Sequence, residues 1–149
     1  MIGFFRAKAR AADMKVRALE MDSTYSHPYS WIGLAYVQEE MYDDAIEVLQ
    51  IGAKSPLYGA RCIGTLGYTY AVQGKRDSAL VQLKHLDELS REKVIDHRFF
   101  AWIYMGLGEK EKAIEMLEKG YEKRSGGLIL LHNDPIFNPL RSNLKFKTL

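Results

Sequence analysis

Histidine and acidic side chains are the residues of this chain that could carry acid–base or metal chemistry. The histidines are His27, His85, His97 and His132, and none has a second histidine four residues away, as a helical zinc site would need. His97 directly follows Asp96, and this spacing favours a pair on a helix surface over an acid–base couple. The spacing therefore predicts neither a metal ion nor a catalytic base.

Cys62 and the glycines that follow it are the next candidates for chemistry. Cys62 is the only cysteine and is expected in the first turn of a helix, where a thiol pKa can be lowered, but no base is placed to serve it. Gly64, Gly67 and Gly74 follow helical rather than strand spacing, so they do not predict a phosphate-binding loop. We therefore expect no catalytic residue, no cofactor and no enzymatic activity.

An internal repeat determines which elements position these side chains. Alanines, tyrosines and small residues recur at intervals of 34 residues. The repeated columns are Gly33, Gly67 and Ala101; Tyr36, Tyr70 and Tyr104; and Ala45, Ala79 and Ala113. A fixed interval of this length indicates stacked helical hairpins.

The residue types in these columns suit two antiparallel helices in close contact. We expect the small residues of each first helix to face the alanines of the second, where missing bulk lets the backbones approach. Gly74 and Gly108 are expected to end a first helix in the left-handed conformation. The first unit has Glu39, Glu40 and Met41 instead, so an irregular turn is expected there.

These columns resemble those of tetratricopeptide repeat (TPR) proteins. The resemblance implies an all-α fold, a TPR α-solenoid of stacked antiparallel helix hairpins that forms a right-handed superhelix. We expect a single domain over residues 1–149. Its expected parts are a half repeat at 1–25 with the second helix only, repeats at 26–59, 60–93 and 94–127, and a C-terminal capping segment at 128–149.

The half repeat at 1–25 has no first helix to cover it. Ala11 and Ala18 fall in the alanine columns of this earlier unit. Either the natural protein extends further upstream, or another surface covers the helix, because an uncapped solenoid end exposes apolar area. A homodimer through the half repeat is one such cover.

Three helix starts are expected near the C-terminus, at Asp134 before Pro135, at Asn138 before Pro139, and at Ser142. This segment resembles the closing segment of TPR regions in bacterial and archaeal signalling proteins. In those proteins, similar arrays follow a DNA-binding, nucleotide cyclase or protein kinase domain. The resemblance implies a regulatory or oligomerisation module as an alternative to a simple scaffold.

The TPR resemblance also implies where a partner would bind. The first helices of a TPR array line an inner groove, and here they carry aromatic side chains with arginines nearby. Such a face suits an extended peptide or a short partner helix, because aromatic rings contribute much apolar area and arginine can orient a carboxylate. The predicted groove residues are Trp31, Leu34, Arg61, Thr65, Tyr68, Arg98, Phe99 and Trp102.

Other interpretations compete with an open, protein-binding groove. The chain's own Phe137, Leu140 and Phe146 could cover it, and some of the predicted rings could be ordinary contacts between adjacent units. A small-molecule sensor that uses the groove as a pocket is a further alternative. The leading interpretation is an interaction scaffold that binds a protein or peptide.

The composition agrees with an interaction domain in the cytoplasm. The chain has 21 basic and 19 acidic side chains and a formal net charge of +2, which argues against nucleic acid as a direct partner. The apolar run at the N-terminus is too short for a signal peptide or a membrane span. A single cysteine cannot form an internal disulfide, so we expect the reducing cytoplasm.

Overall fold

The computed structural model describes residue 13 and residues 27–56, 59–123 and 131–149, and these residues form helices, turns and connecting segments without a strand. The helices are α2 (His27–Gln38), α3 (Tyr42–Ala53), α4 (Gly59–Val72), α5 (Arg76–Ser90), α6 (His97–Gly106), α7 (Lys110–Glu122), the 3₁₀ helix η2 (Pro135–Leu140) and α8 (Leu144–Lys147). The predicted all-α fold of stacked helices is confirmed. The half repeat at 1–25, with Ala11 and Ala18, lies outside the described residues apart from Asp13.

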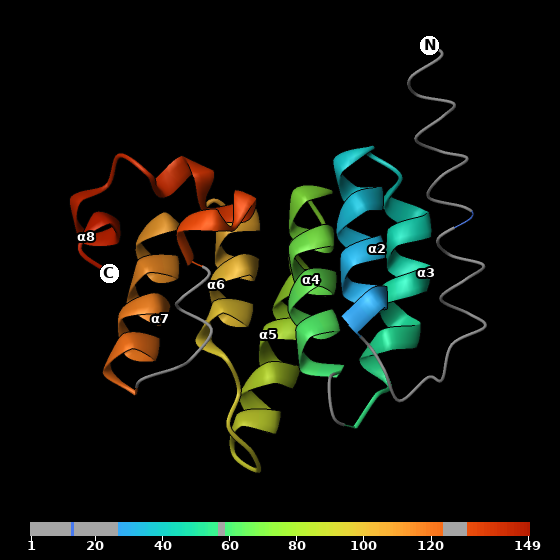
Figure 1. The fold of residues 1–149 in the computed structure, drawn as a ribbon. Coiled ribbons are helices and arrows are strands. Elements are labelled where there is room, and N and C mark those ends of the chain that lie inside the picture. Colours follow the sequence, from blue (N-terminus) through green and yellow to red (C-terminus); the bar gives the residue numbers. More distant parts are fainter. Residues whose placement is uncertain (1–12, 14–26, 57–58, 124–130) are drawn as a thin grey trace.

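The long helices pair into hairpins that lie side by side (Figure 1). Helix α2 packs on α3, α4 on α5, and α6 on α7. Helix α4 also contacts α2, α3 and α6, so it holds the array together at its centre. The closing segment with η2 and α8 lies at the α6–α7 end of the array (Figure 1). The boundaries of the units at 26–59, 60–93 and 94–127 stay a prediction.

The small residues of the first helices make room for large side chains. A Cβ atom added at Gly33 would lie 2.5 Å from Leu49, and one added at Gly67 would lie 2.5 Å from Ile103. The nearest neighbours of Gly33 and Gly67 are therefore these larger side chains rather than the alanine column. In a close-packed interior the space left by a missing side chain is filled, here by an aliphatic group. Because Ile103 belongs to α6, Gly67 also lets the neighbouring hairpin approach α4.

The other repeated columns lie in the core or at its edge. The alanines of the second helices, Ala45, Ala79 and Ala113, are fully buried, as is Ala101 on α6. Of the three tyrosines, Tyr36 is buried, while Tyr70 and Tyr104 are half-buried and pack against the core from its edge.

The turns after α2, α4 and α6 share one geometry. Gly74 and Gly108 have φ angles of 78° and 76°, and Glu40 in the equivalent position has a φ angle of 57°. In each turn a backbone amide donates over 2.9 Å to the carbonyl of the repeated tyrosine, from Met41 to Tyr36, from Lys75 to Tyr70 and from Glu109 to Tyr104. The irregular turn expected in the first unit is therefore wrong: Glu40 adopts the left-handed conformation, and the same hydrogen bond closes the turn.

Only one of the three expected helix starts near the C-terminus is correct. Asp134 caps η2, but Asn138 lies inside η2, and Ser142 does not cap α8. Asn143 caps α8 instead, and its side chain accepts two backbone amides of the first turn over 2.9 and 3.3 Å. The shift arises because the backbone amide of Asn143 still donates to the carbonyl of Leu140 over 2.9 Å, so the preceding turn ends at Asn143.

We expect Glu40→Gly to raise the free energy of unfolding by about 0.5–1 kcal/mol, because glycine adopts a positive φ angle without the steric cost of a Cβ atom. Urea denaturation followed by circular dichroism measures the change. Gly74→Ala is the matched control: a Cβ atom there would have nothing within 4 Å, so backbone strain alone should lower stability by about 1 kcal/mol. A Glu40→Gly variant no more stable than the wild type would contradict strain in the first turn.

Candidate functional site

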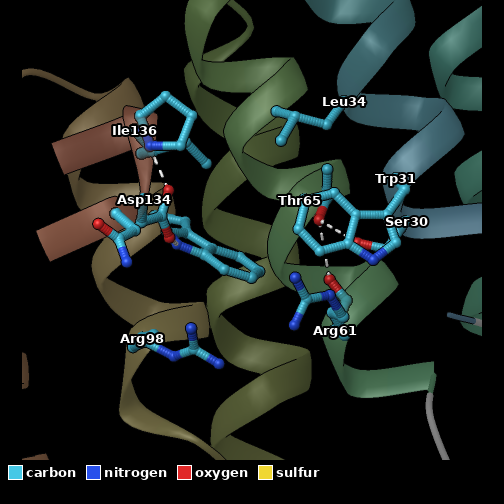
Figure 2. A pocket seen from close by; sticks show the side chains of 11 residues that line it. Ser30, Trp31, Leu34, Arg61, Thr65, Arg98, Asp134 and Ile136 are labelled. Carbon is cyan, nitrogen blue, oxygen red and sulfur yellow. Dashed lines mark hydrogen bonds between the residues drawn. The ribbon is translucent and has the colours of Figure 1, made fainter. Parts of the chain in front are cut away.

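A pocket of about 160 Å³ lies between α2, α4, α6 and the residues that lead into η2 (Figure 2). We call it the central pocket. Its surface is mostly apolar, and the residues that line it are Ser30, Trp31, Leu34, Arg61, Thr65, Arg98, Trp102, Asn133, Asp134, Pro135 and Ile136. A buried hydrogen bond of 3.1 Å joins the hydroxyl groups of Ser30 and Thr65 across α2 and α4, and the Thr65 hydroxyl also donates to the carbonyl of Arg61 over 3.0 Å.

Six of the eight predicted groove residues line the central pocket, and Tyr68 and Phe99 do not. Tyr68 lines a neighbouring hollow that shares Leu34 and Ile136 with the pocket, and burial raises the pKa of its hydroxyl group. Phe99 packs α6 against α4: a Cβ atom added at Gly64 would lie 2.9 Å from the Cβ atom of Phe99. Phe99 is therefore a contact between helices, as one of the alternative interpretations of the rings anticipated.

Arg61 lies between two tryptophan rings. Its guanidinium carbon is 4.9 Å from the ring centre of Trp31 and 5.2 Å from that of Trp102. A guanidinium over an aromatic face is attracted by the negative potential of the ring. Trp31 is 57% exposed and Trp102 only 3%, so the guanidinium contacts one exposed and one buried tryptophan.

Arg98, the second arginine of the pocket, is neutralised by a carboxylate. Its Nε and Nη2 atoms donate to Asp96 Oδ2 over 3.1 and 2.9 Å, and its backbone amide donates to Oδ1 over 2.9 Å. Asp96 thereby caps α6. The expected pair of Asp96 and His97 on a helix surface is wrong, because Asp96 precedes the helix and both of its oxygens accept hydrogen bonds from Arg98.

The charge of Arg61 is not matched in the same way. Burial lowers the pKa of Arg61, Arg98 lowers it further, and Asp134 and Asp96 oppose these effects. The group stays protonated, since the ordinary pKa of arginine lies far above neutrality. Within the described part of the chain, Arg61 forms no salt bridge, and its buried Nε has no hydrogen-bond acceptor.

The closing segment forms one wall of the pocket. Trp102 Nε1 donates to Asp134 Oδ2 over 2.7 Å, while Asp134 Oδ1 accepts the backbone amide of Ile136 over 3.0 Å. Phe137, Leu140 and Phe146, which were one alternative cover for the groove, pack in a core cluster with α6 and α7. The tail therefore borders the pocket without filling it.

Sequence reasoning missed the four residues that this wall contributes, Asn133 to Ile136. Asp134 was recognised only as a helix cap, and its contact with Trp102 joins residues 32 positions apart. No local pattern predicts such a contact. The one available signal is that capping uses a single carboxylate oxygen, which leaves the other free for a second donor.

Sequence comparison supports part of the TPR resemblance. Residues 99–122 match the tetratricopeptide repeat. The match covers most of α6 and α7, and no curated protein and no solved structure shows significant similarity to the chain. A TPR hairpin indicates a protein–protein interaction module, and such modules are typically non-catalytic. None of the helices in the described residues has the length and apolar character needed to cross a membrane.

We expect Asp134→Ala to lower the free energy of unfolding by about 1–3 kcal/mol, because the buried Trp102 N–H loses its acceptor and η2 loses its cap. Chemical denaturation followed by tryptophan fluorescence measures the loss. Asn143→Ala removes only a cap, that of α8, and should cost about 1 kcal/mol or less. Both variants are also measured in a Trp102→Phe background. If Asp134→Ala, like Asn143→Ala, lowers the free energy of unfolding there by as much as in the wild type, the bond from Trp102 to Asp134 contributes nothing to stability.

Proposed function

We propose that the central pocket binds a peptide segment or a short helix of a partner protein, and that the protein is an interaction scaffold without chemistry of its own. The observation that carries the proposal is the exposed Trp31 ring over Arg61 at a largely apolar pocket. Tryptophan and arginine are the residues that most often dominate the energy of protein interfaces. An exposed pair of this kind is therefore suited to anchor a partner.

The dimensions of the site favour a peptide over a free metabolite. A pocket of about 160 Å³ is smaller than the roughly 300–1,000 Å³ of sites that enclose small molecules. It accommodates one or two side chains. The neighbouring hollow around Tyr68 shares Leu34, Pro135 and Ile136 with it, so a longer segment can occupy both depressions. This continuity suits an extended chain or one face of a helix.

We also propose that the hairpins α2–α3 and α4–α5 are TPR units like the matched one. The turn after each first helix is closed by an equivalent hydrogen bond to a tyrosine carbonyl, and each second helix buries an equivalent alanine. The predicted units at 26–59, 60–93 and 94–127 follow from this equivalence. Helices α2, α4 and α6 then supply one wall each to a site that belongs to the array rather than to any single hairpin.

We expect Trp31→Ala to weaken partner binding by about 1–4 kcal/mol, as truncation of an anchoring aromatic does. Trp31 is preferable to Trp102 because its exposed ring can be removed with little effect on folding, whereas Trp102 is buried. Tyr121→Ala is the matched control, since Tyr121 is 60% exposed and lies on α7, outside the pocket lining.

The measurement is a quantitative pull-down from a lysate of the source organism with the wild type and both variants, followed by calorimetry on the partner that Trp31→Ala loses. The proposal expects this partner to be retained by Tyr121→Ala. A set of bound proteins that is identical for the wild type and Trp31→Ala would remove the central pocket from consideration.

A further inference from the structure

The charged side chains that line the central pocket differ in how far their hydrogen-bonding groups are already used. Arg98 is held by Asp96 through two side-chain hydrogen bonds. Both oxygens of Asp134 already accept hydrogen bonds, from Trp102 and from the backbone of Ile136. Neither Asp134 nor Arg61 forms an ion pair within the described residues, but Arg61 is the one whose side chain also makes no hydrogen bond there.

Two aromatic rings border the guanidinium of Arg61. Its central carbon lies over both, 4.9 Å from the ring centre of Trp31 and 5.2 Å from that of Trp102. A guanidinium attracted to aromatic rings still directs its in-plane N–H donors to an acceptor. A planar carboxylate is the group that accepts two such donors at once.

We propose that the central pocket is selective for an acidic side chain, aspartate or glutamate, in the partner segment, with its carboxylate on the guanidinium edge of Arg61. This inference rests on the proposed function, because it names the chemistry of the segment that the pocket binds. The apolar surface around Arg61, with Leu34 and Ile136, contacts the methylene groups and the neighbouring side chains of that segment. Burial of Arg61 strengthens the contact, because charges attract more strongly where water is displaced.

A side-chain carboxylate fits this site better than the C-terminal carboxylate of a partner. One recurring way in which proteins capture a C-terminal carboxylate is a group of free backbone amides. On the pocket wall the amide of Asp134 donates to Leu131 O, and that of Ile136 donates to Asp134 Oδ1. Pro135 between them has no amide hydrogen, so the stretch from Asp134 to Ile136 offers no such group.

The test selects peptides on the wild type, Arg61→Met and Arg76→Met from a random-peptide phage library, in which the displayed peptides have no free C-terminus. Arg76→Met removes the same charge from an exposed arginine whose partner, Glu109, lies outside the pocket. Circular dichroism checks that all variants are folded. A selected peptide is then synthesised with an amidated C-terminus, with glutamate and with glutamine at the enriched position, and titrated against each protein by calorimetry.

We expect acidic residues at one fixed position of the peptides selected by the wild type and by Arg76→Met, and no such enrichment with Arg61→Met. The glutamate peptide should bind the wild type about tenfold more tightly than the glutamine peptide, as expected for a charge-assisted hydrogen bond, and Arg61→Met should bind both equally. Arg61→Lys should keep part of the preference.

Three results would overturn the inference. Peptides that need Trp31 but show no acidic preference would contradict it and leave the proposed function intact. A neutral peptide that binds through a free C-terminus more tightly than the acidic amidated one would contradict the choice of a side chain. Selection of peptides that bind Trp31→Ala as well as the wild type would contradict both the inference and the proposed function.

Discussion

The indole of Trp102 is the group on which the geometry of the pocket depends. It is buried on α6, its N–H group holds Asp134, and Arg61 and Arg98 lie 5.2 and 5.8 Å from its ring centre. This rigid ring thus positions the pocket wall formed by Asn133 to Ile136 next to the guanidinium of Arg61. Because an unpaired buried N–H costs more than its hydrogen bond gains, the closing segment is fixed at the point where it borders the site.

The positive charges of Arg61 and Arg98 repel each other, and the carboxylates around the pocket reduce this repulsion. Asp96 neutralises Arg98 at the start of α6, while Asp134 and Asp96 oppose the lowering of the Arg61 pKa by Arg98. The result is asymmetric. Arg98 is used by the structure, whereas the side-chain donors of Arg61 are not used by the described residues, and Arg61 lies at a partly buried position where water screens its charge only weakly.

Periodicity was sufficient to predict the helical hairpins and most of the pocket lining, because both depend on spacing along a helix. It failed where a contact is not periodic. Asp134 meets Trp102 across 32 residues, and the aromatic type of Phe99 does not reveal that α6 approaches α4 closely at this residue. At Glu40 the residue type was misleading, because it suggested an irregular turn. The hydrogen bond from Met41 to Tyr36 gives this turn the same geometry as the turns at Gly74 and Gly108.

The departures from the repeat explain why a pocket exists at this position. Trp31, Thr65 and Phe99 occupy one repeated column, yet the first is exposed, the second is buried and the third packs between helices. Three large rings in this column would fill the face of the array. The small Thr65 in the middle unit leaves space that Trp31 and Arg61 border. The regular helices therefore form the walls of the pocket, and the residue that departs from the repeated pattern leaves the space between them.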